Sequence, residues 1–133
     1  MRVADLMKTA LKTISTDATV LDAVDALARS QVSALPVVDR FGRAVGIVTT
    51  RDVLKAESAC ASPNAREQLF ERTLALEIMT PWAATISPSA DVTQAARRML
   101  DLNVQRLFVE DGGRLVGVIS QTDLVGVVAT ARL

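Results

Sequence analysis

The sequence predicts an α+β fold in which a β-α-β-β-α unit occurs twice. Three observations carry this prediction. The chain has 133 residues, which is enough for one ordinary domain or for two small units that share a core. Its two halves are similar to each other, as in a tandem repeat. Within each half, short apolar runs alternate with segments whose apolar residues recur at helical spacing.

Two aligned blocks define the repeat. The stretch LMKTALKTISTDATVLDAV, which starts at Leu6, aligns with IMTPWAATISPSADVTQAA, which starts at Ile78. The stretch VSALPVVDRFGRAVGIVTTRDVL then aligns with VQRLFVEDGGRLVGVISQTDLV after one residue is dropped in the turn. We therefore divide the chain into a first repeat (1–57), a linker with a short helix (58–73) and a second repeat (74–133).

Each repeat opens with a short strand followed by an amphipathic helix. Thr19 and Asp22 have the spacing of an N-cap residue and its reciprocal partner in the first helical turn. Asp91 and Gln94 have the same spacing in the second repeat. The predicted strands are 13–15 and 85–87, and the predicted helices are 20–30 and 92–102.

A hairpin and a second helix complete each repeat. Two compact apolar runs joined by a glycine-containing turn are typical of a β-hairpin. A hydroxyl residue, followed three positions later by aspartate, then begins the last helix in both GIVTTRD and GVISQTD. One such unit alone buries too little apolar surface for a stable core. The predicted hairpin strands are 34–38, 45–48, 107–109 and 115–119.

The linker AESACASPNAREQLFERTLAL contains one more helix signal. Ser62 followed by Pro63 favours a helix start, so we expect a partly exposed helix through 66–72. The alternative is a linker without regular structure. Trp82 follows soon after as the only tryptophan, and packing at a repeat or dimer interface is favoured for it over stacking on a base.

Composition excludes several classes of function. Fifteen basic and fifteen acidic residues give zero formal charge, so we expect no nucleic-acid partner. No apolar run reaches the ~18 residues of a membrane span and no signal-peptide core is found, so we expect a cytoplasmic protein without membrane insertion. The chain has no histidine and one cysteine, Cys60. We therefore expect no enzyme, no metal site and no catalytic cofactor.

The hydroxyl-x-x-aspartate motif has two interpretations. It is close to a capping box, which stabilises a helix whether or not a ligand exists. It is also suited to a nucleotide, because the two oxygens of Asp52 or Asp123 can accept both hydroxyls of a ribose. The hydroxyls of Thr49 and Ser120, with nearby backbone N–H groups, would bind a phosphate at the helix N-terminus. Its occurrence after an apolar strand in both repeats favours binding.

Taken in order, DLM and EIMTP, VSALPVVD, GIVTTRD and GVISQTD resemble the motifs of a tandem pair of CBS domains, the modules named after cystathionine β-synthase. The resemblance covers nearly everything from Val3 to Ala129. It implies two repeats packed sheet to sheet about a pseudo-twofold axis, with two clefts between them. It also implies a homodimer, an adenosine-containing ligand such as AMP, ADP, ATP or S-adenosylmethionine, and a separate effector protein that responds to it.

The same resemblance assigns residues to the two clefts, each of which combines an early strand and hairpin of one repeat with the aspartate motif of the other. The first cleft would contain Lys12, Thr13, Val32, Ser33, Ala34, Pro36, Arg106, Val118, Ser120 and Asp123. The second cleft would contain Ala84, Thr85, Val104, Gln105, Leu107, Phe108, Ile47, Thr49, Arg51 and Asp52. The small Ser33 and Ala34 leave room for a base, whereas Gln105 and Phe108 are bulkier, so the first cleft is favoured.

These expectations lead to one function and one alternative. The chain is expected to be a stand-alone regulatory module that senses an adenosine nucleotide and acts on a partner in trans. The alternative is a dimerisation scaffold that has the fold but needs no ligand.

Overall fold

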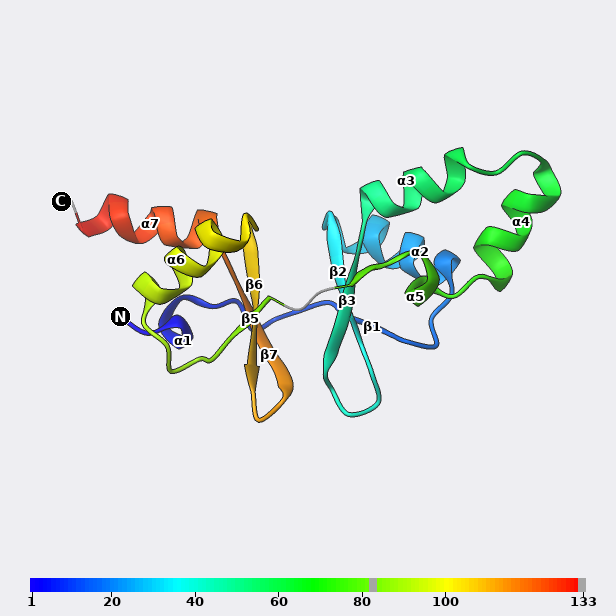
Figure 1. Ribbon diagram of the computed structural model, residues 1–133. Helices are drawn as coiled ribbons and strands as arrows, with labels where there is room; N and C mark the ends of the chain where they lie inside the picture. Colours follow the sequence, from blue (N-terminus) through cyan, green and yellow to red (C-terminus); the bar gives the residue numbers. More distant parts are fainter. Residues whose placement is uncertain (82–83, 132–133) are drawn as a thin grey trace. The chain divides into compact units, whose positions relative to one another are not determined.

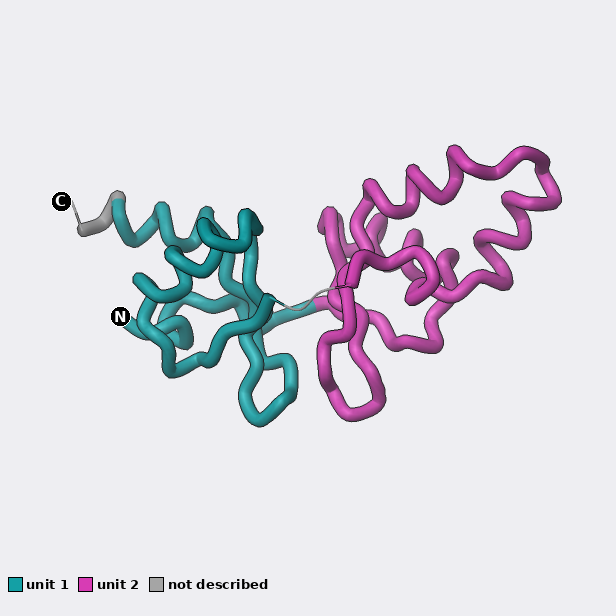
Figure 2. Tube along the Cα trace, in the orientation of Figure 1, with its two compact units in different colours: residues 1–11, 84–133 teal, residues 12–83 magenta. Residues whose placement is uncertain are grey.

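The structure of the protein, a computed structural model, describes residues 1–81 and 84–131. Trp82, and with it the packing expected for that residue, lies outside this range. The chain divides into two compact units, of which unit 1 comprises residues 1–11 and 84–133 and unit 2 comprises residues 12–83 (Figure 2). Each unit has its own sheet and its own apolar core, and the α+β fold with two sheets confirms the predicted fold class.

Unit 2 contains a four-stranded sheet with the order β1-β2-β3-β4. Strand β1 is parallel to β2, and the other neighbouring pairs are antiparallel. The helices lie on one face of this sheet (Figure 1). The elements are β1 (Ile14–Ser15), α2 (Val20–Ser30), β2 (Ala34–Val38), β3 (Ala44–Thr49), α3 (Thr50–Ser58), α4 (Pro63–Arg72), α5 (Ala75–Ile78) and β4 (Thr80–Pro81).

Unit 1 repeats this plan with a three-stranded sheet of order β5-β6-β7. Strand β5 is parallel to β6, and β6 forms an antiparallel hairpin with β7. Lys8 forms an isolated bridge to Val118 at the outer edge of β7. The elements are α1 (Val3–Leu6), β5 (Thr85–Ile86), α6 (Val92–Leu102), β6 (Arg106–Asp111), β7 (Arg114–Ser120) and α7 (Gln121–Ala131).

The predicted helix starts are confirmed by their side-chain caps. Thr19 Oγ1 accepts the Asp22 N–H at 3.1 Å, and the Thr19 N–H donates to Asp22 Oδ2 at 2.9 Å. At α6, Asp91 Oδ1 accepts the Thr93 N–H at 2.8 Å, and the Asp91 N–H donates to Gln94 Oε1 at 2.9 Å. The caps satisfy N–H groups that the first helical turn leaves without partners, which is why α2 and α6 begin at the predicted residues.

The linker helix is also confirmed. Helix α4 begins at Pro63 directly after its N-cap, Ser62, whose Oγ accepts the Ala65 N–H at 3.1 Å. The alternative of a linker without regular structure is wrong, because this cap and the proline at the first helical position together favour the helix.

The segment before each repeat packs in the compact unit built around the other repeat. Val3, on α1, is fully buried in the core of unit 1, and its N–H donates to the Ala90 carbonyl at 2.8 Å. Ala75, on α5, is fully buried in the core of unit 2, and its N–H donates to the Ala18 carbonyl at 2.8 Å. The compact units therefore follow a different division from the sequence repeats, with residues 1–11 and 74–83 exchanged.

Candidate functional site

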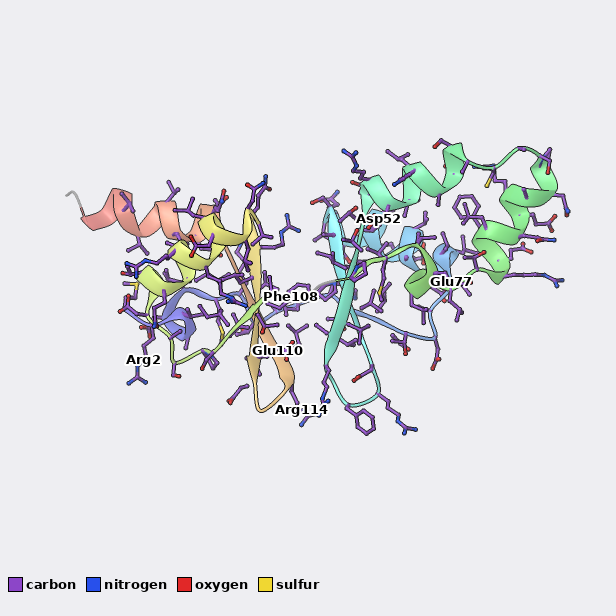
Figure 3. All side chains as sticks on the ribbon, viewed as in Figure 1. Arg2, Asp52, Glu77, Phe108, Glu110 and Arg114 are labelled. Carbon is purple, nitrogen blue, oxygen red and sulfur yellow. The ribbon has the colours of Figure 1, made fainter. Side chains whose placement is uncertain are left out.

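The strand-to-helix junction of unit 2 carries Asp52 at the start of α3 (Figure 3). Thr49 ends β3 and caps the helix, since its Oγ1 accepts the Asp52 N–H at 3.1 Å. In return, the Thr49 N–H donates to Asp52 Oδ2 at 2.9 Å. Both residues are half-buried. The junction thus fixes the position of the Asp52 carboxylate through two hydrogen bonds to its own helix start.

Unit 1 has the same junction between β7 and α7. The Ser120 N–H donates to Asp123 Oδ2 at 2.9 Å, and Ser120 Oγ accepts the Asp123 N–H at 3.2 Å. Both residues are again half-buried. The capping-box interpretation is therefore confirmed in both repeats. It accounts for one oxygen of each carboxylate and leaves the other oxygen, Oδ1, directed elsewhere.

The helix N-termini at these junctions are less open to an anion than the sequence suggests. At α3, the Thr50 N–H donates to the Ser33 carbonyl at 3.0 Å, and the Asp52 N–H is taken by Thr49. At α7, the Gln121 N–H donates to the Gln105 carbonyl at 2.9 Å. Among the described residues, only the second N–H of each helix, that of Arg51 or Thr122, stays without a partner. A phosphate would therefore depend on cationic side chains more than on backbone donors.

The two carboxylates differ in their second oxygen. Thr80, on β4, donates its hydroxyl to Asp52 Oδ1 at 3.1 Å, with Oδ2 at 3.4 Å. Asp123 Oδ1 accepts no hydrogen bond from the described part of the chain. Sequence reasoning did not single out Thr80. The signal that would have found it is the repeat alignment, which places Thr80 opposite Lys8.

Each hairpin brings together residues that were assigned to both predicted clefts. In unit 2, Ala34 pairs with Thr49 and Pro36 with Ile47. In unit 1, the equivalent pairs connect β6 with β7, where Arg106 faces Ser120 and Phe108 faces Val118. Half of one predicted cleft therefore lies beside half of the other on a single sheet. The first cleft divides between unit 2 (Lys12, Thr13, Val32, Ser33, Ala34, Pro36) and unit 1 (Arg106, Val118, Ser120, Asp123).

The second cleft divides in the same way, between unit 1 (Ala84, Thr85, Val104, Gln105, Leu107, Phe108) and unit 2 (Ile47, Thr49, Arg51, Asp52). Parallel pairing places Thr85 beside Phe108, and the Phe108 N–H donates to the Ala84 carbonyl at 3.2 Å. Arg51 and Gln105 are exposed. The crossed combination of half-sites, which requires residues from both units, stays a prediction.

Burial separates the apolar members of the predicted clefts. Leu107 has no exposed surface and belongs to the core cluster that also holds Met99 and Ile119. Its side chain is therefore part of the core, and only its backbone is open to a role in binding. Phe108 in unit 1 and Ile47 in unit 2 are buried as well, but strand alternation places each on the face of its own sheet that is opposite to the core of that unit. Strand alternation thus gives these two side chains a different environment from that of Leu107.

Two features are absent from the described residues. No group of three or more cysteine and carboxylate side chains is arranged to hold a metal ion in the described residues. Within that same range, no helix is sufficiently long and apolar to cross a membrane.

Comparison with known proteins shows what this geometry resembles. A CBS domain protein of Dictyostelium discoideum is 35% identical over 127 residues, which are 92% of this chain and 88% of that protein. CBSX2 in complex with AMP has a TM-score of 0.79 at 25% identity, with 99% of this chain and 98% of that chain covered.

A second solved structure is the CBS domain pair of protein MJ0100 in complex with 5′-methylthioadenosine and S-adenosyl-L-methionine. It has a TM-score of 0.75 at 25% identity, and the match covers 96% of this chain and 99% of that chain. The family model of the CBS domain matches residues 3–59 and again residues 75–130. With both repeats matched and the fold shared along nearly the whole chain, this protein belongs to the CBS domain family as a tandem pair.

Proposed function

We propose that the chain is a regulatory module that binds an adenosine-containing nucleotide, AMP, ADP, ATP or S-adenosylmethionine, in clefts between its two repeats. The observation that carries the proposal is the duplicated junction in which a fixed, half-buried carboxylate keeps acceptor capacity beyond its helix cap. The complexes of CBSX2 with AMP and of the MJ0100 domain pair with S-adenosyl-L-methionine support this ligand class.

Ribose recognition follows from the chemistry of the carboxylate. An ionised aspartate has about four acceptor sites, and hydrogen bonds to a charged acceptor are stronger than bonds between neutral groups. At Asp123, one site is used by the Ser120 N–H, which leaves room for both hydroxyls of a ribose. The cap thereby contributes to binding, because it holds the carboxylate in one orientation before the ligand arrives.

Phosphate recognition would depend on arginine and lysine. The fork of an arginine guanidinium suits a phosphate, and Arg106 lies on β6 opposite Ser120 in the register of unit 1. Lys12 in the first cleft and Arg51 in the second are exposed cations that could serve the same purpose. Apolar residues of the hairpins would hold the adenine.

The output is proposed to pass to a separate protein in the cytoplasm. Nucleotide binding can shift the packing of the repeats only if one arrangement binds the nucleotide more tightly than the other. A second copy of the chain is the partner that we expect on the helices. Leu54 is 65% exposed beside an apolar groove of about 280 Å³, which is lined by Val24, Leu27, Ala28, Thr50, Val53 and Leu54. Apolar helix faces of this kind favour a homodimer.

Thermal unfolding with and without nucleotide tests the proposal. A ligand at 100 times its Kd stabilises the folded state by about 2.7 kcal/mol, so AMP, ADP, ATP or S-adenosylmethionine should raise the Tm. Asp123→Asn keeps an oxygen for the Ser120 N–H but replaces the other acceptor with a donor, so it should reduce this gain. Asp22→Asn is the matched control, because the Asp22 carboxylate accepts the Thr19 N–H in the same way at α2 and lies outside both predicted clefts.

If none of the four nucleotides binds saturably, the ligand-independent scaffold becomes the better description. One observation favours that alternative. The caps of Asp52 and Asp123 are complete without any ligand. A scaffold would show a concentration-dependent dimer whose Tm does not respond to nucleotide.

A further inference from the structure

Thr80 and Lys8 occupy equivalent places at the edges of the two sheets. Thr80 pairs with Ile47 on β3, and Lys8 pairs with Val118 on β7 through two hydrogen bonds of 2.9 and 3.0 Å. In both units a glycine of the neighbouring strand lies close to the backbone of this residue. A Cβ atom on Gly46 would lie 2.8 Å from the Thr80 carbonyl oxygen, and one on Gly117 would lie 3.0 Å from the Lys8 carbonyl oxygen.

This equivalence places the two side chains toward the capped carboxylates. Side chains of paired residues share a face of the sheet, as do residues two apart along a strand. The Thr80 side chain therefore starts on the same face as Ile47 and Thr49, and its hydroxyl reaches Asp52. The Lys8 side chain starts on the corresponding face of unit 1, but lysine carries no hydroxyl. Lys8 is exposed and forms no salt bridge with any described residue.

The carboxylates consequently enter ligand binding with unequal acceptor capacity. Asp52 accepts the Thr49 N–H on Oδ2 and the Thr80 hydroxyl on Oδ1. Asp123 accepts the Ser120 N–H on Oδ2. Its Oδ1 accepts no hydrogen bond from the described residues and keeps both lone pairs for a ligand. The Thr80 hydroxyl is chemically the same donor as a ribose hydroxyl, so a ribose bound at Asp52 must share the carboxylate with it or displace it.

We propose that Thr80 is a specificity-determining residue that weakens ribose binding at Asp52, so that each chain takes its first nucleotide at Asp123. The inference rests on the proposed function and adds an order of occupancy to it. The hydroxyl of Thr80 acts as an internal competitor for the ligand, and the absence of a hydroxyl at position 8 leaves Asp123 open. The effect concerns the sugar, and it holds for any ligand with a vicinal diol whatever its phosphate number.

Calorimetry with adenosine and 2′-deoxyadenosine tests this role at Asp52 alone. Asp123→Asn first removes the stronger site from the full-length chain. In that background, Thr80→Val frees an acceptor site and should tighten adenosine binding about tenfold, the scale of one hydrogen bond to a charged group. Binding of 2′-deoxyadenosine, which lacks one of the two hydroxyls, should change much less. Thr80→Ser restores the hydroxyl and should restore the weaker affinity.

The reciprocal experiment uses Asp123 in an Asp52→Asn background. Lys8→Thr introduces a hydroxyl at the position equivalent to Thr80 and should weaken adenosine binding about tenfold. Lys8→Met removes the charge without adding a hydroxyl, and should not produce this loss with uncharged adenosine. Melting temperatures without ligand show whether each variant is folded.

The outcomes separate this inference from the proposed function. If the wild-type chain binds AMP or adenosine but Thr80→Val leaves the adenosine affinity unchanged, the role of Thr80 is wrong and nucleotide sensing stands. If Thr80→Val tightens the binding of adenosine and of 2′-deoxyadenosine by the same factor, Thr80 acts on the base and the inference also fails. If neither the wild-type chain nor any variant binds adenosine or any of the four nucleotides, both proposals fall together.

Discussion

The junctions β3–α3 and β7–α7 have the same reciprocal capping hydrogen bonds, but they lie beside different leading segments. In unit 2 the segment ends in Thr80, which donates a hydrogen bond to Asp52. In unit 1 the equivalent position is Lys8, and Asp123 keeps its second oxygen. The comparison teaches that a tandem repeat can conserve a scaffold while one neighbouring side chain changes the chemistry of the site.

The largest expected effect tests whether the two cores are equivalent. Leu35 in unit 2 and Leu107 in unit 1 occupy matching positions and have no exposed surface. Substitution of either by alanine should lower the free energy of unfolding by about 2–5 kcal/mol, because it removes buried methyl groups and leaves a cavity. Urea denaturation followed by circular dichroism measures both.

A loss below about 1 kcal/mol for Leu107→Ala would contradict the assignment of its side chain to the core. Phe41→Ala is the surface control, since Phe41 is 60% exposed in the turn between β2 and β3 and should matter little to unfolding.

Gly46 and Gly117 sharpen the comparison at the sheet edges. A Cβ on Gly46 would meet the Thr80 carbonyl oxygen at 2.8 Å, and one on Gly117 would meet the Lys8 oxygen at 3.0 Å. Overpacking of this kind costs about 1–3 kcal/mol, so Gly46→Ala and Gly117→Ala should both destabilise the fold, the first more than the second. Gly126→Ala is a control, since nothing lies within 4 Å of its Cβ position. Chemical denaturation measures both losses in the free energy of unfolding. Equal losses, or a larger loss for Gly117→Ala, would contradict this order.

The smallest effect concerns the caps of α2 and α6. The backbone N–H of Thr93, followed by its side chain, lowers the pKa of the Asp91 carboxyl below its usual 3.8. A lowered pKa in the folded state stabilises the protein above the usual pKa, and this contribution is lost as the pH falls through the lowered value. Asp91→Asn, which keeps a capping oxygen, should therefore reduce the drop in Tm between about pH 6 and about pH 2.5.

Helix α2 provides the matched control for that measurement. Its capping oxygen belongs to Thr19, which does not titrate in this range, so Thr19→Asn should leave the acid dependence as it is. Acid dependence that survives Asp91→Asn unchanged would assign it to other carboxylates.

Local signals made most of the fold predictable. Caps are made within three residues, so Thr19 and Asp91 set the starts of α2 and α6 to the residue. Strand β2 has the predicted bounds, whereas β3, β6 and β7 extend one or two residues beyond the predicted ends, because ladder pairing continues beyond the apolar runs. The four-residue helices α1 and α5 were not predicted, since one turn carries too little periodicity to be recognised.

The rest could not be predicted, because it depends on contacts between distant parts of the chain. The Thr80–Asp52 hydrogen bond joins residues 28 positions apart. Likewise, the repeat alignment shows that α1 and α5 are equivalent, but it does not show which core each one enters. The capping box could be predicted at Asp52 and Asp123. The hydrogen bonds from the Thr50 and Gln121 N–H groups to the carbonyls of Ser33 and Gln105, just before β2 and β6, could not.

The exchange of leading segments also orders events during synthesis. Residues 12–83 form unit 2 from one continuous stretch, so this unit can fold as soon as it has left the ribosome. Residues 1–11 emerge before unit 2 but belong to unit 1, whose strands β6 and β7 emerge after unit 2. Val3 is therefore synthesised early and buried late. It stays exposed until β6 and β7, which supply part of its core, have been synthesised.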